Sequence, residues 1–384
     1  MIYISVDNDH HGGLALSLIK KHGLTVENVT FISHISRRNN TIPGSIYTSQ
    51  IIAGHPLSSG SGYKNLISYI RSILHQRLLN KIFRFDEQDV LLIITEYQIN
   101  NALLARKMKR AGGQVFLFDE GISFYFNNSS FHDTQTSLAN NFFLLLYNLA
   151  FGVLGIPAYA RKGFEGRMYV RIKDVFIDRI YSSIRLPINR PGEIHGYRNL
   201  LSSEETLKNK NENSAIFFAN NLSCFGLKDE ELAISGDAVR QMAVAFETVY
   251  LKIHPADWVE KNDIFQFYKI LVDSHPNVHL VDNSMTGNEA IERIRPHIVV
   301  GAMGAAMFDA FFFGCQPIFL FQLLPAVEEF EVCRFTLKNI GYRYINGLEE
   351  IGPDYRCGID ISSLLYEEGK DDTLYKSQTK MCSL

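Results

Sequence analysis

The chain has 384 residues, of which 46% are hydrophobic and 21% charged, and its formal net charge at pH 7 is −3. That length exceeds one ordinary hydrophobic core and favours two domains, and the composition excludes a disordered or fibrous chain. So small a net charge supplies no global field for nucleic acid, and we expect no nucleic-acid partner. The five cysteines are odd in number, widely spaced and without a C-x-x-C pair, which indicates reduced thiols in the cytoplasm.

The first half of the chain alternates strand-like and helix-like segments. It opens on a strand-like run without a basic leader, so we expect no targeting segment. Short apolar runs predict strands at residues 2–6, 29–33, 90–94 and 115–118. The stretches between them predict helices at residues 14–22, 66–79 and 100–110. Strand–helix–strand units with short loops indicate a parallel sheet with crossover helices.

A polar stretch at residues 203–214 then predicts a linker, after which the alternation begins again. Strands are expected at residues 215–218, 249–253, 278–281, 298–300 and 317–321. Helices are expected at residues 237–247, 263–274, 288–293 and 305–313. The chain is therefore predicted to be an α/β protein with two Rossmann-like lobes, residues 1–205 and 213–366, and a mobile tail at 367–384. Ligands of such sheets bind beyond the carboxyl ends of the strands.

One apolar stretch, residues 142–160, needs to be weighed as a membrane segment. Its apolar core is shorter than the roughly 20 residues of a spanning helix, and Asn148 and Pro157 interrupt it. Two alternatives stay open: a buried helix between lobes or at a homodimer contact, and a peripheral helix on the inner membrane. A basic run that suits anionic lipid follows it: Arg161, Lys162, Arg167, Arg171 and Lys173.

The most informative motif is Asp119-Glu120-Gly121, directly after the strand expected at 115–118. A strand end is a rigid place from which to aim a carboxylate into a cleft. Such a carboxylate can take the proton from an attacking hydroxyl as general base. The alternative is an ordinary turn, because Asp and Gly often end strands.

The second motif is His254-Pro255, which follows the strand at 249–253 in the second lobe. Histidine can donate a hydrogen bond to a phosphate, or a proton as the phosphate leaves. Pro255 fixes the chain direction, and Lys252 adds positive charge close by. A turn histidine without a chemical role is the alternative.

The third motif, Gly301-Ala302-Met303-Gly304, joins a strand to a helix start. Backbone N–H groups at a helix start can cradle an anion, although the motif is neither a Walker A loop nor a dinucleotide fingerprint. Close packing of small residues against the sheet is the alternative.

In their order and spacing, these three motifs resemble the bacterial sialyltransferase and polysialyltransferase families, which have the GT-B fold of two Rossmann-like lobes with parallel sheets facing a central cleft. The resemblance implies a general base at Asp119, favoured over Glu120, and a phosphate contact from His254. It also implies Glu289 at the cytidine ribose and the loop Asn220-Asn221 near the donor. One departure is that those families usually have a serine pair in the third motif, where this chain has glycine and alanine.

The loop Asp7-Asn-Asp9-His10 contains a D-x-D pattern that binds metal in another glycosyltransferase fold. Here it follows the first strand, and one short loop seldom supplies a complete ligand set, so we expect no metal. We interpret Asp7, Asp9 and His10, with Gly121, as residues on the acceptor side of the cleft.

The resemblance implies an inverting, metal-independent glycosyltransferase that moves sialic acid from CMP-sialic acid to a hydroxyl of a bacterial surface glycan, such as capsule, lipooligosaccharide or O-antigen. No cofactor is expected, and the partners are the nucleotide sugar and the glycan acceptor. Two alternatives remain: a transferase for another nucleotide sugar, with Kdo or glucose, and a non-catalytic protein that binds nucleotide sugars or glycans. A dehydrogenase is disfavoured, because no strand is followed by the glycine fingerprint.

Overall fold

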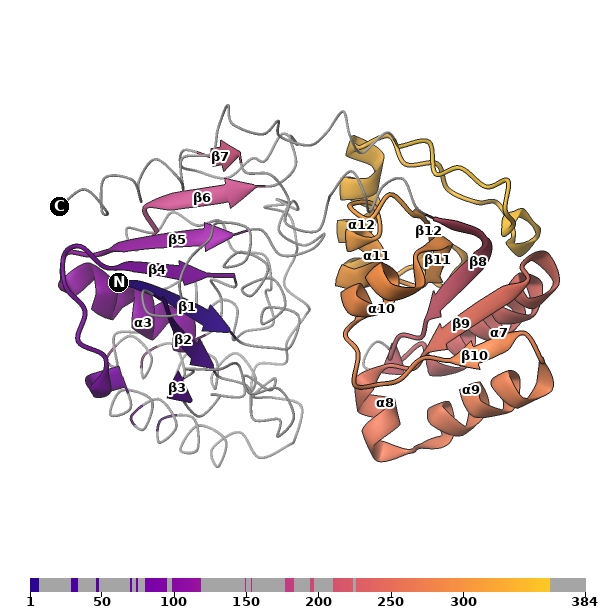
Figure 1. Cartoon of the computed structure of the whole chain (residues 1–384), viewed down its shortest axis with the longest axis horizontal. Helices are drawn as coiled ribbons and strands as arrows, with labels where there is room; N and C mark the ends of the chain where they lie inside the picture. Colours follow the sequence, from indigo (N-terminus) through magenta and orange to yellow (C-terminus); the bar gives the residue numbers. More distant parts are fainter. Residues whose placement is uncertain are drawn as a thin grey trace.

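The computed structural model of the chain describes residues 1–6, 29–33, 46–47, 70, 74, 80–94, 99–118, 149, 153, 177–182, 194–196, 210–223 and 226–359. These residues form two parallel sheets, one of seven strands and one of five, each accompanied by helices (Figure 1). The predicted α/β architecture is therefore confirmed.

The first sheet has the strand order β3-β2-β1-β4-β5-β6-β7, and every neighbouring pair is parallel. Its strands are β1 (Ile2–Val6), β2 (Val29–Ser33), β3 (Ile46–Tyr47), β4 (Val90–Ile93), β5 (Gln114–Phe118), β6 (Arg179–Ser182) and β7 (Ile194–Gly196). A 3-10 turn (Asn80–Ile82) precedes β4, and α3 (Ile99–Arg110) lies between β4 and β5. The strand order reverses between β1 and β4, which is the switch point of a doubly wound sheet.

Continuous apolar runs form the centre of this sheet because helices of a parallel sheet cover both of its faces. All residues of β1 and β4 are buried. The hydroxyl of Ser5 in β1 donates to the side-chain oxygen of Asn101 in α3, at 2.5 Å. This bond satisfies a buried polar group and ties the helix to the sheet.

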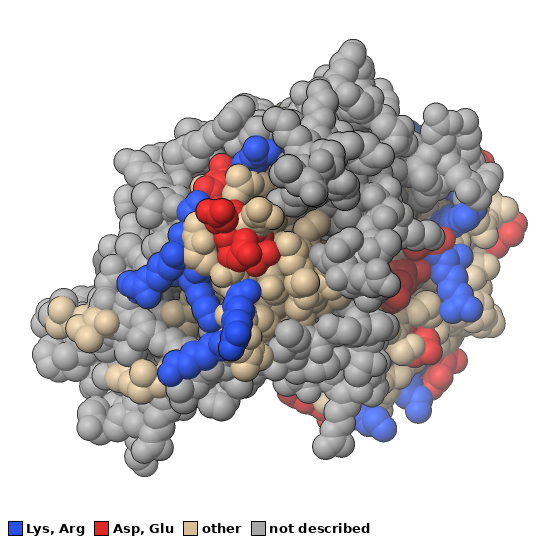
Figure 2. All heavy atoms as spheres, turned by 60° about the vertical axis from the view of Figure 1, so that its left-hand side comes forward, with Lys and Arg blue, Asp and Glu red and all other residues tan. Residues whose placement is uncertain are grey.

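The amino ends of these strands carry charges of both signs. The amino group of Met1 pairs with Asp89 at 2.8 Å, and Lys109 at the end of α3 pairs with Asp178 at 2.6 Å. Figure 2 shows basic and acidic side chains adjoining on the described part of this face. The described charges on this face therefore neutralise one another locally rather than forming a surface of one sign.

The second sheet has the order β10-β9-β8-β11-β12 and is also entirely parallel. Its strands are β8 (Asn211–Phe218), β9 (Thr248–Lys252), β10 (Val278–Leu280), β11 (Pro296–Gly301) and β12 (Gln316–Phe319). Its helices are α7 (Lys228–Ala245), α8 (Pro255–Glu260), α9 (Asp263–Ser274), α10 (Gly287–Ile294), α11 (Ala305–Asp309) and α12 (Glu328–Asn339), with 3-10 turns at Leu320–Leu323 and Leu348–Glu350. Figure 1 shows α7 and α9 on one side of the sheet and α10, α11 and α12 on the other. The switch point lies between β8 and β11.

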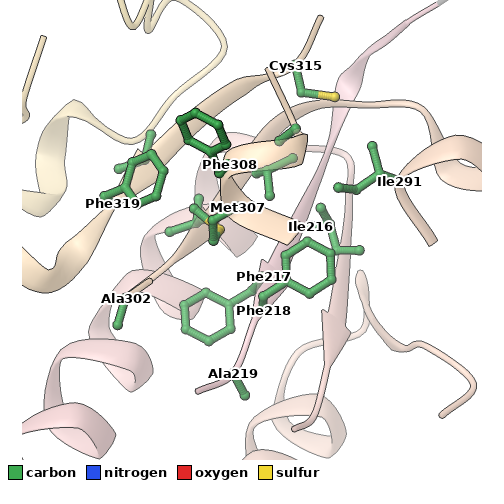
Figure 3. Packing of buried hydrophobic residues seen from close by; sticks show 14 of the residues in the cluster. Ile216, Phe217, Phe218, Ala219, Ile291, Ala302, Met307, Phe308, Cys315 and Phe319 are labelled. Atoms are coloured by element: carbon green, nitrogen blue, oxygen red, sulfur yellow. The ribbon is translucent and has the colours of Figure 1, made fainter. Parts of the chain in front are cut away.

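The core of the second lobe contains many aromatic side chains. Figure 3 shows Phe217 of β8, Phe308 of α11 and Phe319 of β12 within one buried cluster. The rings of Phe308 and Phe311 meet edge to face with centroids 5.7 Å apart, a favoured aromatic geometry. The cysteines among the described residues, Cys315, Cys333 and Cys357, are buried and have free thiols. Burial raises the pKa of Cys315 and of Cys333 to about 12, so neither is a reactive thiolate near neutral pH.

Several element boundaries differ from the sequence-based expectation. The strand expected at 215–218 begins at Asn211, so the predicted linker overlaps it; Ser214 is buried and pairs in register with Thr248. The helix expected at 237–247 begins at Lys228, with Asp229, Glu230 and Glu231 in its first turn. Carboxylates there complement the helix dipole. The helix expected at 305–313 ends at Asp309.

Some expectations fall mostly or wholly outside the described residues. Of the helix expected at 66–79, residues 70 and 74 are described, and both are helical; the helix expected at 14–22 and the tail lie outside. Within the apolar stretch 142–160, Leu149 and Val153 are helical and 58% and 88% exposed. In the described part of the chain, no helix is both long and apolar enough to cross a lipid bilayer.

Candidate functional site

Three strands of the second sheet end side by side at its carboxyl edge. Phe218, the last residue of β8, is in register with Lys252 of β9 and with Gly301 of β11. This edge lies at the switch point, where open α/β sheets bind their ligands. The predicted residues Asn220, His254 and Gly304 each follow one of these strands, so the fold brings them to one edge.

Asn220 holds the third motif directly. Its side-chain oxygen accepts hydrogen bonds from the backbone N–H groups of Ala302 (2.9 Å) and Met303 (3.3 Å). Its amide nitrogen donates to the carbonyl oxygen of Met303. We expected these two N–H groups to cradle a phosphate and Asn220 to lie near the donor. In this structure both N–H groups donate to the Asn220 side chain instead. Asn220 therefore fixes the shape of the loop at the end of β11.

Glycine is required at Gly301 by close packing and at Gly304 by its backbone conformation. A Cβ on Gly301 would lie 2.9 Å from the carbonyl oxygen of Phe218 and 3.0 Å from the sulfur of Met307. Gly304, the residue before α11, has a φ of 134°, a conformation that side chains rarely adopt. The close packing of small residues, which we weighed as the structural alternative, is thus present at Gly301.

Lys252 supplies a cationic group at this edge. Its side chain is only 5% exposed, and its Nζ has no hydrogen-bond partner among the described residues. Burial lowers the pKa of Lys252, and the carboxylates of Asp282 and Glu289 oppose that shift. A buried amine without a partner is costly, so it favours a nearby anion.

His254 lies directly before the short helix α8, which begins at Pro255. Pro255 is its first residue, a position that suits proline because its missing N–H would have no partner there. The carbonyl oxygen of His254 accepts from the backbone N–H of Trp258 at 3.1 Å. The half-buried His254 is therefore held at the junction of β9 and α8, two residues beyond Lys252.

Glu289 belongs to a capping box at the start of α10. Its carboxylate accepts from the backbone N–H of Thr286 at 2.6 Å, and the Thr286 hydroxyl accepts from the Glu289 N–H at 3.2 Å. The amide of Asn288 donates to Asp309 of α11 at 3.0 Å. These contacts orient an exposed carboxylate at a helix start that is tied to the helix after the third motif.

Two site carboxylates were not predicted from the sequence. Asp257, three residues after His254, accepts from the Asn221 amide at 2.9 Å and is fully buried. Glu231 accepts from the backbone N–H of Leu222 at 2.7 Å. The signal for both was weak: each is an acid in the first turn of a helix that follows a strand.

The predicted residues of the first lobe lie outside the described part of the chain. They are Asp7, Asp9, His10, Asp119, Glu120 and Gly121. β5 ends at Phe118, directly before Asp119, and β1 ends at Val6, directly before Asp7. The expectation that both motifs follow strands is confirmed, and their roles remain predictions.

Solved structures share the fold at low sequence identity. The UDP-GlcNAc 2-epimerase of Methanocaldococcus jannaschii, in complex with UDP-GlcNAc and UDP, has a TM-score of 0.50 and 11% identity and covers 100% of this chain and 99% of its own. The UDP-GlcNAc 2-epimerase of Neisseria meningitidis bound to UDP-GlcNAc has a TM-score of 0.47 and 12% identity, and the match covers 91% of this chain and 88% of that one. The spinosyn rhamnosyltransferase SpnG with thymidine diphosphate has a TM-score of 0.47 and 11% identity, and the match covers 90% of this chain and 86% of that one. No curated protein sequence matches the chain. The chain is an α/β protein of the GT-B type.

A family model described as alpha-2,8-polysialyltransferase (POLYST) matches residues 25–320. Because this match spans most of the chain, the chain belongs to the alpha-2,8-polysialyltransferase family and is a glycosyltransferase. The class implies a nucleotide sugar and a glycan acceptor as its partners.

Proposed function

We propose that the chain transfers sialic acid from CMP-sialic acid to a hydroxyl of a bacterial surface glycan, with inversion at the anomeric carbon. The family supports a sialyl donor. The observation that carries the proposal furthest is Lys252, a buried amine without a hydrogen-bond partner among the described residues, at the strand edge where a ligand is expected. An anionic phosphate next to it would compensate for the burial of its charge.

In the proposed reaction, the acceptor oxygen attacks the anomeric carbon while the bond from that carbon to the phosphate oxygen breaks. The electron pair of the broken bond leaves with CMP, and the hydroxyl proton passes to a carboxylate, which we assign to Asp119 with Glu120 as its neighbour. His254 donates to the departing phosphate, and Lys252 lowers the energy of its charge. A monophosphate leaving group carries less charge than a diphosphate, so these groups can neutralise it without a metal.

The remaining contacts to the donor are assigned by position. Glu289 is a hydrogen-bond acceptor suited to ribose hydroxyls, and the capping box with Thr286 holds its backbone and one carboxylate oxygen in place. The loop of Gly301 to Gly304 closes the phosphate side, with Asn220 fixing its shape. Asn221 and Pro255 support the same edge. Asp7, Asp9, His10 and Gly121 are assigned to the acceptor side.

A second candidate is transfer from another nucleotide sugar, such as one with Kdo or glucose. It is favoured by the third motif, in which the N–H groups of Ala302 and Met303 donate to Asn220 and no serine pair is present. A protein that binds a nucleotide sugar without turnover is a third candidate.

We propose a cytoplasmic location with a peripheral contact to the inner membrane. The exposed apolar side chains of Leu149 and Val153, two helical residues four positions apart in the sequence, support a surface contact. The basic residues after position 160 suit anionic lipid. A homodimer contact through the same stretch is the competing proposal.

The test is release of CMP from CMP-sialic acid by the purified protein, with and without galactose-terminated acceptors. His254→Ala and Asp119→Ala are expected to abolish transfer while the protein stays folded. His279→Ala, which removes an exposed histidine from β10, is the matched control and is expected to retain activity. Consumption of a different nucleotide sugar would show that the donor is not CMP-sialic acid, while the proposed mechanism would still apply. Nucleotide binding that survives Asp119→Ala, with no turnover of any sugar, would favour the binding protein.

A further inference from the structure

The loop between β8 and α7 is anchored by two buried carboxylates from different helices. Glu231 of α7 is 2% exposed, and its carboxylate accepts from the Leu222 N–H at 2.7 Å. Asp257 of α8 is 0% exposed, and its Oδ1 accepts from the Asn221 amide at 2.9 Å. Both carboxyl groups are buried away from water, where a lost hydrogen bond is costly, so these two contacts restrain the loop.

Asn220 lies directly before these anchored residues. Its side chain uses both its acceptor and its donor on the backbone of Ala302 and Met303. Such a bidentate contact depends on the direction of the amide plane, which the backbone of the neighbouring Asn221 helps to set. A chain of contacts therefore runs from Asp257 through Asn221 and Asn220 to the loop after β11.

Asp257 also lies close to His254 in the sequence. Asp257 lies in the first turn of α8, three residues after His254. Its Oδ1 also accepts from the amide of Asn262 at 2.8 Å, and Asn262 caps α9 through the Phe265 N–H at 3.1 Å. One buried side chain thus joins the histidine segment, the loop after β8 and the start of α9.

We propose that Asp257 is a positioning residue, which holds Asn221 so that Asn220 can fix the backbone of Ala302 and Met303 relative to His254. The proposal rests on the proposed function only in assigning the donor to this edge. Breaking the Asp257–Asn221 bond removes one of the two hydrogen bonds that Oδ1 of this buried carboxylate accepts and releases the Asn221 side chain. We expect the loss of this bond to loosen the loop of Ala302 and Met303 as well, although neither Asp257 nor Asn221 is hydrogen-bonded to that loop in the contacts described above.

The first test needs no ligand. In Asn221→Asp, two carboxylates face each other, and we expect amide hydrogen exchange of the peptide containing Ala302 and Met303 to accelerate about tenfold, equivalent to roughly 1.4 kcal/mol. The double variant Asn221→Asp/Asp257→Asn restores a carboxylate–amide bond with its direction reversed. It is made and compared in an Asn262→Ser background, because the Asn262 amide donates to the same Oδ1 and would otherwise face the new amide, and it should restore slow exchange. Asn221→Ala provides the same test if Asn221→Asp does not fold.

The control variant is Asn262→Ser, which keeps a capping oxygen for α9 and removes the other amide from Asp257. A purely structural role for Asp257 predicts equal effects at residues 302–303 from both sites. Unchanged exchange there in the Asn221 variants, or a double variant that stays as fast as the single one, would overturn the proposal.

The second test uses turnover of CMP-sialic acid. The Asn221→Asp variant should raise KM for the donor about tenfold, the equivalent of one lost hydrogen bond of roughly 1.4 kcal/mol, and the double variant should reverse this. If the wild-type protein does not turn over CMP-sialic acid, the proposed donor is refuted. The hydrogen-exchange result then decides the role of Asp257 independently. A donor KM unchanged by a variant that does loosen the loop would refute the assignment of the donor to this edge.

Discussion

Gly301 packs against Phe218 so closely that a Cβ atom on the glycine would lie 2.9 Å from the phenylalanine's carbonyl oxygen. The two residues are partners in the β8–β11 ladder at the centre of the second sheet. The backbone of the candidate site therefore has no spare room between its two central strands.

Gly301→Ala is accordingly expected to destabilise the protein. The methyl group must push apart β8 and β11 or displace the Met307 sulfur, and overpacking of this kind costs about 1–3 kcal/mol. Gly352→Ala is the matched control, because a Cβ there meets nothing within 4 Å; its effect should stay within about 0.5 kcal/mol. Urea unfolding of the three proteins checks the prediction, and equal midpoints would contradict it.

Stability and donor binding are expected to move in opposite directions at Lys252. Lys252→Met replaces a buried, unpaired amine with an apolar side chain of similar length, so we expect the free energy of unfolding to stay constant or to rise by about 1 kcal/mol. Affinity for CMP should fall at least about tenfold, because a buried charge pair worth more than 1.4 kcal/mol is lost. Calorimetric titration and thermal unfolding measure the two quantities. A variant that loses stability yet binds CMP normally would show that Lys252 is structural.

Glu231 should make stability depend on pH near neutrality. Burial, aided by the Asp257 carboxylate, raises the pKa of Glu231 to about 7, while the hydrogen bonds from the Leu222 and Asn220 backbones oppose the shift. The native state then holds this proton more tightly than the unfolded chain, whose pKa is near 4.5. Its contribution is fully present below pH 4.5 and is lost as pH rises through about 7.

Glu231→Gln keeps an acceptor for the Leu222 N–H and removes the titration. We expect the wild type to lose about 1–3 kcal/mol relative to this variant between pH 5 and 8.5. Urea unfolding at several pH values gives the two curves. Parallel curves would mean that Glu231 is ionised throughout, with its charge satisfied in another way.

The capping box of α10 offers a separate test of Glu289. Thr286→Ala removes the hydroxyl that accepts from the Glu289 N–H and should cost about 1 kcal/mol of stability, whereas Thr286→Ser keeps it. If the carboxylate orientation matters for the ribose, donor KM should rise in the alanine variant and not in the serine variant. A donor KM that is the same in both variants would show that the helix cap does not orient Glu289 for a ribose contact.

Sequence patterns were sufficient where apolar runs are bounded by polar turns. β1, β2 and α9 have the predicted bounds, because their hydrophobic period ends abruptly at both sides. β6 and β7 were missed, since Arg-Ile-Tyr-Ser and Ile-His-Gly are too short to show a period. The polar start of β8 was assigned to a linker because pairing with β9 and β11, not side-chain pattern, makes it a strand.

The candidate site divides in the same way. Strand ends could be located along the chain, so His254 and the loop at 301–304 were expected at the carboxyl edge where they lie. The exchange of hydrogen bonds between Asn220 and Met303 could not be predicted, because the two are adjacent only after β8 and β11 pair. Burial of Asp257 likewise depends on the packing of α8 against α9 rather than on local sequence.

The pairing of β8 with β11 also has a consequence for the order in which the chain is made. Asn211 pairs with Pro296 and Phe218 with Gly301, so the central strand of the second lobe emerges from the ribosome long before its second neighbour. Until residues 296–301 are synthesised, one edge of β8 has no strand beside it, and contacts this distant in sequence form slowly. A nascent chain stalled before residue 296 should therefore remain sensitive to protease throughout the second lobe, and one released after β12 should become resistant.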